Sequence, residues 1–400
     1  MNTPLEQSEG MTCDRRFDEV RQTLVECLNK ERDEQGAALC VYFEGRSVVN
    51  IWGGAAEPGI PWTNKTLQPL TSITKPILTF ALLRLAEQGL LDLDGPVAEV
   101  WPEFAANGKA DLRVSHVLSH AAGLPIFKHP VTLDEQIARV PLLEQLEQMA
   151  PLWSPGSAHG YHAITFGFIV TEILRRSAGL APEAALNQLV AAPLNAQISL
   201  GIQEHEIPLV ARIQAPKQEE PPAPDSDPEI AEYCTALTTK SSLLYRATFG
   251  STAMTFEDMN DLRYLTAPRP AGYGTAHGVA RAFAAAAGVL DGHEWLSPNI
   301  RKNLRKRHAH GIDQVFRVFT SWGLGVLLPG TRLIPNLPNG AFGHLGSTGS
   351  IAFADPDNAL AFAFLPSRMK SVFEIPDKRA SVLIECVYRC LLRSKRKTLA

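Results

Sequence analysis

The sequence contains no long apolar run. No stretch of about eighteen consecutive apolar residues, the length that a membrane-spanning helix needs, occurs among its 400 residues. Residues 1–30 are polar and charged, and they lack the apolar segment behind a basic start that marks a signal peptide. We therefore expect neither a membrane span nor secretion, which places the protein in the cytoplasm.

Cysteine and positive charge are also limited. The six cysteines form no C-x-x-C pair and lie mostly in apolar segments, so we expect reduced, buried thiols. The net charge of -4 argues against a nucleic-acid-binding surface. With 45% hydrophobic and 20% charged residues, the chain has the composition of an ordinary globular protein.

Several motifs of other hydrolases and of cofactor-binding proteins are missing. The sequence has no G-x-S-x-G, so an α/β-hydrolase nucleophile elbow is not supported. The pairs at residues 205–206 and 293–294 are His-Glu, but they lack the second histidine of a zinc-binding helix. Residues 272–278 miss the dinucleotide-binding pattern G-x-G-x-x-G by one position. The sequence therefore implies no metal and no cofactor.

The most informative pair of residues is Ser72 and Lys75, which form the pattern S-x-x-K. A serine hydroxyl attacks a carbonyl carbon only when a nearby base takes its proton. A lysine three residues later lies on the same face of a helix, and it can be that base when burial lowers its pKa. The alternative interpretation is a helix-capping serine followed by an exposed lysine.

The S-x-x-K pattern occurs three times, and the surrounding sequence separates the three occurrences. Residues 394–397 lie in a basic terminal segment, and residues 367–370 lie at a turn after an apolar strand. Ser72 precedes a long apolar helix pattern, Ile77 to Gln88. The free N–H groups and the positive dipole end of such a helix favour a nucleophile at its start. These features favour Ser72 as the catalytic serine.

The hydrophobic periodicity predicts helices around a sheet. Helices are expected at residues 17–30, 77–88, 113–119, 132–148, 164–177, 275–289 and 378–393. Strands are expected at residues 38–43, 47–52, 322–328, 340–344, 350–354 and 360–365. An N-terminal hairpin and C-terminal strands indicate one antiparallel sheet that is covered by the first and last helices.

This order of elements predicts an α+β fold, in which an antiparallel sheet is flanked by helices and carries a helical insertion domain. The sheet domain is discontinuous and takes residues 15–110 and 235–395, whereas residues 111–234 form the mostly helical domain. Residues 1–14 are expected to be disordered, and the Pro/Glu/Asp-rich residues 214–230 to form a mobile loop. A cleft between the two domains is the expected place for a site.

Four ordered segments resemble motifs of the serine β-lactamase-like superfamily. They are Ser72–Lys75 with the S-x-x-K pattern, Val117–Leu124, Trp153–Ala163 with a P-G-x…Y element, and Phe342–Ser347 on a strand. The resemblance covers roughly residues 35–390 and is greatest to the class C-like esterases called family VIII carboxylesterases. It implies a β-lactamase/transpeptidase-like fold.

The resemblance also implies a role for each site residue. Ser72 is the nucleophile, and Lys75 and Tyr161 transfer its proton, although the sequence leaves open which of the two is the base. A phenol between two cations has a lowered pKa, which we expect for Tyr161. The backbone N–H groups of Ser72 and Ser347 form the oxyanion hole, and Gly346 leaves room for the substrate.

Two residues depart from the pattern of relatives that act on β-lactams. His344 stands where those relatives carry a lysine that binds the substrate carboxylate, and a neutral histidine is a poorer anchor. Ala163 stands where β-lactamases keep an asparagine. Both changes favour neutral esters over β-lactams.

The leading hypothesis is therefore a serine hydrolase that cleaves small-molecule carboxylic esters through an acyl-enzyme on Ser72. The alternative is an acyltransferase of the same fold, which passes an acyl group to a metabolite hydroxyl or amine. A β-lactamase and a non-catalytic scaffold are less favoured, because His344 replaces the lysine and because the serine, lysine and tyrosine are all present. The sequence leaves the oligomeric state open.

Overall fold

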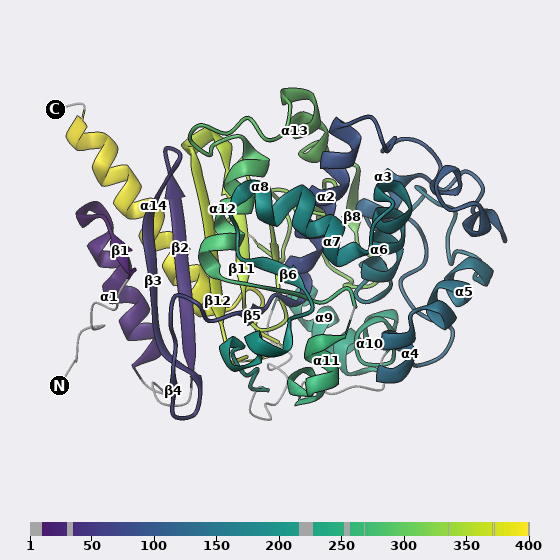
Figure 1. Cartoon of the computed structure of the whole chain (residues 1–400), viewed down its shortest axis with the longest axis horizontal. Coiled ribbons are helices and arrows are strands. Elements are labelled where there is room, and N and C mark those ends of the chain that lie inside the picture. Colours follow the sequence, from purple (N-terminus) through teal and green to yellow (C-terminus); the bar gives the residue numbers. More distant parts are fainter. Residues whose placement is uncertain are drawn as a thin grey trace.

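The computed structural model describes residues 10–29, 35–215, 227–251, 257–267, 269–334, 336–369, 371 and 373–398 (Figure 1). The strands are β1 (Thr12–Cys13), β2 (Gly36–Phe43), β3 (Arg46–Glu57), β4 (Ile60–Pro61), β5 (Gln68–Pro69), β6 (Ile198–Leu200), β7 (Gly272–Gly274), β8 (Ala309–Ile312), β9 (Phe319–Trp322), β10 (Phe342–Leu345), β11 (Ile351–Asp355) and β12 (Leu360–Pro366). The helices are α1 (Asp18–Leu28), α2 (Thr74–Glu87), α3 (Val114–Leu118), α4 (Leu133–Ala138), α5 (Val140–Gln148), α6 (Thr165–Ala178), α7 (Pro182–Leu186), α8 (Ala192–Leu194), α9 (Pro228–Thr238), α10 (Leu243–Thr248), α11 (Leu262–Thr266), α12 (Ala276–Ala287), α13 (Pro298–Leu304) and α14 (Lys378–Thr398).

The main sheet joins the two ends of the chain. Its strands follow the order β1-β3-β2-β12-β11-β10, all neighbours are antiparallel, and β4 pairs with β3. The central pair is β2 with β12, in register from Phe43 opposite Leu360 to Ala37 opposite Pro366. The N-terminal hairpin and the C-terminal strands are therefore neighbours in one sheet, as the order of elements predicts.

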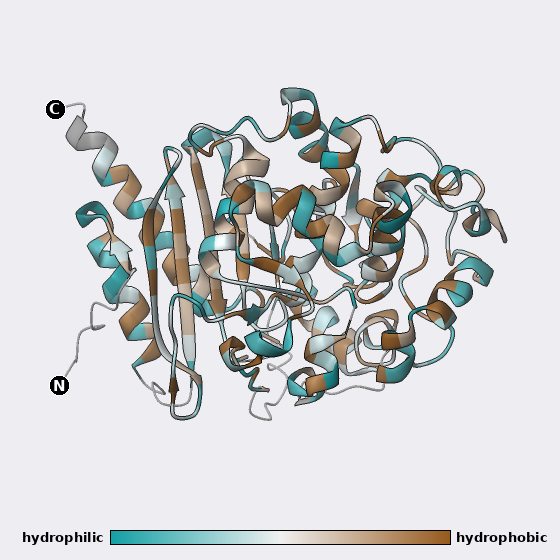
Figure 2. Ribbon diagram, viewed as in Figure 1, coloured by the Kyte–Doolittle hydropathy of each residue, from teal (hydrophilic) through white to brown (hydrophobic). Residues whose placement is uncertain are grey.

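The two faces of the sheet carry side chains of different size. Along β12, Phe362 and Phe364 face α1 and α14, whereas Ala361 and Ala363 face the alanine-rich helix α12. Because successive strand residues point to opposite faces, this alternation lets α12 approach closely and leaves the large aromatic groups to fill the opposite layer. Figure 2 shows apolar and polar residues alternating along α1 and α14, as expected for helices that cover a sheet.

Helix α2 lies between the sheet and the helical part of the molecule. Almost all of its residues are buried, and it packs against α6 (Figure 1). A short 3-10 turn, Thr71–Ile73, leads into it. A helix that is apolar on all sides is buried on all sides. A residue at the start of α2 is therefore positioned by contacts with both the sheet and the helical part of the molecule.

The predicted α+β fold, an antiparallel sheet flanked by helices, is confirmed. The expectation of disorder is wrong for Thr12 and Cys13, which pair with β3 at Asn50 and Val49. Helix α9 begins at Pro228, within the expected mobile loop, and it also contains the expected domain boundary at residue 235. Residues 216–226 of that loop lie outside the described residues, and the division into two domains stays a prediction.

Two predicted elements differ from those observed. The expected helix at 132–148 is divided into α4 and α5 at Arg139, which has a φ of 61°. Pro141 lies two residues later, in the first turn of α5. Only Trp322 of the expected strand at 322–328 lies in a strand, as the last residue of β9, and the chain then turns at Gly325 with a φ of 66°. A side chain at Gly325 would collide with Thr79 on α2, so only glycine fits this turn.

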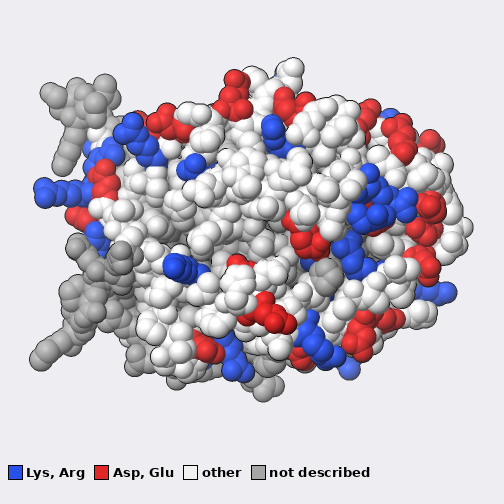
Figure 3. Space-filling model, viewed as in Figure 1, with Lys and Arg blue, Asp and Glu red and all other residues white. Residues whose placement is uncertain are grey.

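Charges are mixed on the face of the molecule shown in Figure 3, where Lys and Arg are interspersed with Asp and Glu. Among the helices of the described residues, none reaches the length and apolar character that crossing a membrane requires.

The packing of β12 leads to a prediction about stability. Phe362→Ala removes a fully buried ring that stacks on Phe353 at 5.2 Å, and we expect a loss of about 3–5 kcal/mol in the free energy of unfolding. The control Leu392→Ala truncates a side chain that is 59% exposed, and it should change stability by less than about 0.5 kcal/mol. Urea unfolding followed by circular dichroism measures both. Equal effects of the two changes would contradict the assigned core.

Candidate active site

Ser72 and Lys75 are brought together at the start of α2. The Lys75 Nζ donates to Ser72 Oγ at 3.2 Å and to the Ala163 carbonyl oxygen at 2.8 Å. The 3-10 turn that carries Ser72 continues directly into α2, so the two side chains lie on one side of a continuous helical segment. Both partners of the amine are neutral oxygen atoms.

Burial controls the ionisation of Lys75. The side chain is buried, and this desolvation lowers the pKa of Lys75 to about 7. The Tyr161 ring lies 4.8 Å from Nζ, and such a contact favours the charged amine. Burial outweighs it, because no acidic side chain pairs with Lys75 among the described residues. A substantial fraction of this amine is therefore neutral near pH 7 and can accept a proton.

Tyr161 lies beside both residues, at the end of the loop before α6. Its ring stacks on Phe316 at 4.5 Å, and its hydroxyl interacts with the Ser72 side chain. Asp313 accepts the Tyr161 backbone N–H at 3.1 Å and also two further backbone N–H groups, which fixes the loop. The tyrosine is thus held by the packing of its ring and by the hydrogen bonds that Asp313 accepts from the backbone.

The expected fall in the pKa of Tyr161 is wrong. Burial raises its pKa, the negative charge of Asp313 raises it further, and the hydrogen bond with Ser72 offsets only part of this. The nearby His344 supplies no positive charge, because burial lowers its pKa to about 3. Tyr161 is therefore a neutral phenol that can donate a hydrogen bond and pass on a proton.

His344 is the predicted site residue that the structure places outside the lining of the cavity. Its Nδ1 donates to the Leu345 carbonyl oxygen at 2.7 Å, its side chain is buried, and it is not among the described residues that line the cavity. It lies behind Tyr161, with the two rings 6.0 Å apart. The expectation that His344 contacts substrate is not supported, and the residue instead supports the tyrosine from behind.

The turn of Ser72 is tied to the end of strand β10. The Ser347 N–H donates to Thr71 Oγ1 at 3.1 Å. Thr71 has a φ of 47°, a left-handed conformation that is unfavourable for a β-branched residue. Gly346 permits the approach, since a Cβ there would collide with Thr71 Oγ1 and Ser350 Oγ. The glycine is needed by the packing of the protein itself, which differs from the substrate clearance expected from sequence.

These residues open onto a cavity of about 360 Å³. Ser72, Lys75, Tyr161, Gly346 and Ser347 all line it. Much of the remaining wall is apolar and comes from helices on both sides; it includes Ile164, Phe168, Leu237, Leu244 and Phe316. The cavity can therefore hold a mostly apolar acyl group next to the serine.

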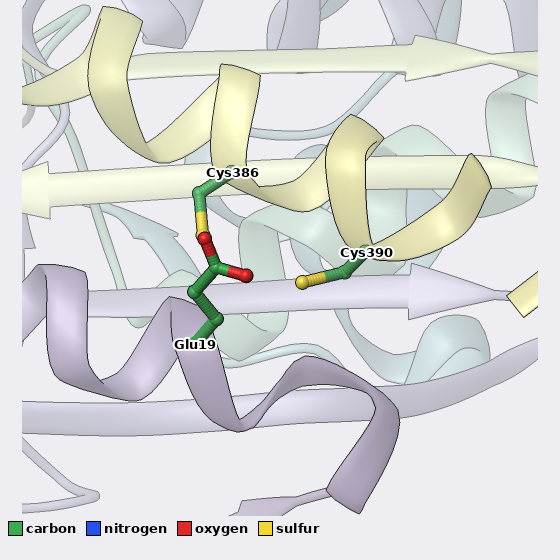
Figure 4. A group of neighbouring side chains, drawn as sticks. All are labelled: Glu19, Cys386 and Cys390. Atoms are coloured by element: carbon green, nitrogen blue, oxygen red, sulfur yellow. The ribbon is translucent and has the colours of Figure 1, made fainter. Parts of the chain in front are cut away.

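One cluster with metal-ligating side chains lies elsewhere. Glu19, Cys386 and Cys390 place one ligand atom each within 4.8 Å of one another, between α1 and α14 (Figure 4). Arg389 and Arg393 already pair with the Glu19 carboxylate, and burial raises the pKa of the Cys390 thiol to about 12. The protonated Cys390 thiol and two adjacent guanidinium groups disfavour a cation there, so the cluster fits a structural role.

Sequence reasoning missed three contributors to the site. They are the Ala163 carbonyl, which holds the lysine, the Thr71 hydroxyl, which accepts from Ser347, and Asp313, which positions Tyr161. A backbone carbonyl carries no signal in the sequence. Asp313 lies 152 positions from Tyr161, so only the fold brings them together.

The fold and this constellation together define a serine hydrolase with the β-lactamase/transpeptidase-like architecture. The chain belongs to the Beta-lactamase family, whose family model matches residues 21–385. It is similar to Esterase/beta-lactamase LipL of Mycobacterium tuberculosis, with 30% identity over 377 residues that cover 90% of this chain and 84% of that protein.

Solved structures show the same similarity over nearly the whole chain. A family VIII carboxylesterase is 30% identical with a TM-score of 0.82, over 95% of this chain and 98% of the other. A penicillin-binding protein homologue from Caulobacter crescentus is 31% identical with a TM-score of 0.81, over the same shares of the two chains. The helical part that completes the cavity thus belongs to the shared architecture.

The packing at Gly346 can be tested directly. Gly346→Ala forces a Cβ against Thr71 and Ser350, and we expect about 1–3 kcal/mol of lost stability. The control Gly95→Ala places its Cβ at 3.0 Å or more from the exposed side chains of Glu99 and Asp92, and it should cost less. Thermal unfolding compares the two variants. A Gly346→Ala protein as stable as wild type would show that this contact is not tight.

Proposed function

We propose that the protein hydrolyses carboxylic esters through an acyl-enzyme on Ser72. The observation that carries the proposal is the buried Lys75 amine, 3.2 Å from Ser72 Oγ, without an acidic partner among the described residues and with a pKa lowered to about 7. A base must be in its deprotonated form when it takes a proton, and Lys75 meets this requirement near neutral pH. Tyr161 does not meet it, because its raised pKa keeps the hydroxyl protonated at neutral pH.

The first half of the reaction forms the acyl-enzyme. The neutral Lys75 amine takes the Ser72 hydroxyl proton as Oγ bonds to the ester carbonyl carbon. Backbone N–H groups of Ser72 and Ser347 stabilise the oxyanion. When the oxyanion collapses, the bond to the alcohol breaks. The departing alkoxide then takes a proton from the Tyr161 hydroxyl, which regains one from the Lys75 ammonium.

The second half releases the acid. Water attacks the acyl carbon and gives its proton to the Lys75 amine, and the bond between the acyl carbon and Ser72 Oγ then breaks. The serine regains its proton from Lys75, so all groups return to their starting state. The same residues would pass the acyl group to an alcohol in place of water, and the product ratio with added methanol measures that transfer.

Features of the cavity favour an ester over a β-lactam as the substrate. His344 is neutral and does not line the cavity, so it supplies no positive charge for a β-lactam carboxylate. Ala163 presents only a methyl group and uses its carbonyl to hold Lys75. Among the similar proteins, the family VIII carboxylesterase carries an esterase name and LipL is named both esterase and beta-lactamase; both match this chain over most of its length.

Removing the nucleophile tests the proposal. Ser72→Ala should lower turnover of p-nitrophenyl butyrate by at least about 10³-fold, because no acyl-enzyme can form. A fluorophosphonate probe should label wild type and fail to label this variant. The control Ser394→Ala changes the serine of another S-x-x-K match and should keep both activity and labelling. Retained turnover in Ser72→Ala would sink the assignment.

The ionisation of Lys75 predicts the pH dependence. Burial lowers its pKa to about 7, so the active neutral form gains population as pH rises. We expect kcat/KM for p-nitrophenyl butyrate to rise through about pH 7 and to level off above it. Lys75→Arg keeps a charge at every pH, and it should lose activity by about 10³-fold throughout. A flat profile in wild type, or an active Lys75→Arg protein, would contradict Lys75 as the base.

A further inference from the structure

We propose that Arg269 forms a carboxylate-binding subsite at the closed end of the active-site cavity. The preferred substrates would then be monoesters of dicarboxylic acids, in which the acyl group carries a free carboxylate. This inference rests on the proposed function and names the substrate class of the same site. Arg269 lines the same cavity as Ser72, and only 3% of the Arg269 surface is exposed.

The guanidinium of Arg269 is held in place by neutral groups. Its Nη1 donates to Gln136 Oε1 at 3.0 Å, and its Nε and Nη2 donate to the Tyr264 carbonyl oxygen at 3.3 and 3.2 Å. The guanidinium carbon lies 3.3 Å from the centroid of the Tyr264 ring. A guanidinium has five N–H groups, of which three make these bonds, and the guanidinium also interacts with the Tyr273 hydroxyl, which leaves at least one N–H group for a ligand.

The charge of Arg269 differs from the other charges in the cavity wall. No acidic side chain pairs with it among the described residues, whereas two carboxylates in the cavity wall have basic partners: Asp377 pairs with Arg379, and Glu374 with Lys378. A buried charge without a partner is unfavourable, and a bound carboxylate would compensate it. The planar fork of arginine also matches the two oxygen atoms of a carboxylate.

The backbone fixes Arg269 relative to the nucleophile. Three residues later, the Gly272 N–H donates to Thr74 Oγ1 at 3.0 Å, and the Gly272 carbonyl accepts the Leu70 N–H at 2.8 Å. Both contacts are to the segment that carries Ser72. Pro270 packs against Gly167 of α6, where there is no room for a side chain. The distance from Ser72 to the guanidinium is thus set by rigid elements.

The position of Arg269 places the carboxylate on the acyl part of the substrate. Ser347 is exposed and marks the open end of the cavity, whereas Arg269 and Gln136 are buried. The alcohol must leave before water reaches the acyl carbon, so it belongs at the open end. The acyl group stays attached to Ser72 through both steps and occupies the closed end.

The experiment compares two esters of equal length, monoethyl glutarate and ethyl valerate, with product quantified by chromatography. In wild type, kcat/KM should be at least about 10-fold higher for monoethyl glutarate, as expected for a charged hydrogen-bonded contact. Arg269→Gln should abolish this preference and keep ethyl valerate turnover within about 3-fold. Arg263→Gln, which removes an exposed arginine paired with Asp134 and Asp261, should retain the preference.

Each outcome decides between the proposals. Equal kcat/KM for the two esters in wild type, or an unchanged preference in Arg269→Gln, would overturn the subsite and leave the esterase intact. Turnover of both esters that persists in Ser72→Ala would overturn the proposed function instead. If Arg269→Gln does not fold, wild type alone still decides, because equal kcat/KM for monoethyl glutarate and ethyl valerate would overturn the subsite.

Discussion

The desolvation of the Lys75 amine is the constraint on which the site depends. A lysine that faced water would stay protonated at neutral pH and could not take a proton from Ser72. Here the amine lies among the start of α2, the Ala163 carbonyl and the ring of Tyr161, and burial alone lowers its pKa to about 7. Every element that keeps water and acidic groups away from this amine therefore contributes to reactivity.

The fold supplies that environment through the packing of its layers. Small side chains on one face of β12 let α12 approach, and the aromatic residues on the other face fill the layer under α1 and α14. The buried helix α2 then carries Ser72 to the junction with the helical part, where Asp313 holds the Tyr161 loop. The neighbouring histidines stay neutral because they are buried, so they add no charge that would compete with substrate. His344 and His162 both have pKa values lowered to about 3.

Sequence could predict the parts of this arrangement that depend on local order. The S-x-x-K spacing, the apolar helix behind it and the alternating strands identify the fold class and bring Ser72 and Lys75 together. The pKa of Tyr161 was predicted in the wrong direction, because burial and the distant Asp313 decide it. The burial of His344 and the neutral partners of Arg269 likewise arise from segments far apart in the chain. Such tertiary environments leave no pattern in a single sequence.

The contact between Thr71 and Ser347 connects the strained turn to the chemistry. Thr71 keeps a left-handed φ of 47°, and its hydroxyl accepts the N–H that we assign to the oxyanion hole. An oxyanion bears more charge than a hydroxyl oxygen and forms the stronger hydrogen bond, so it can displace or share this acceptor as it develops. The ground-state carbonyl has less charge and competes less well. The threonine contact therefore weakens substrate binding more than it weakens stabilisation of the transition state. Catalysis requires such a difference, because only interactions that are stronger in the transition state than in the bound substrate accelerate the reaction.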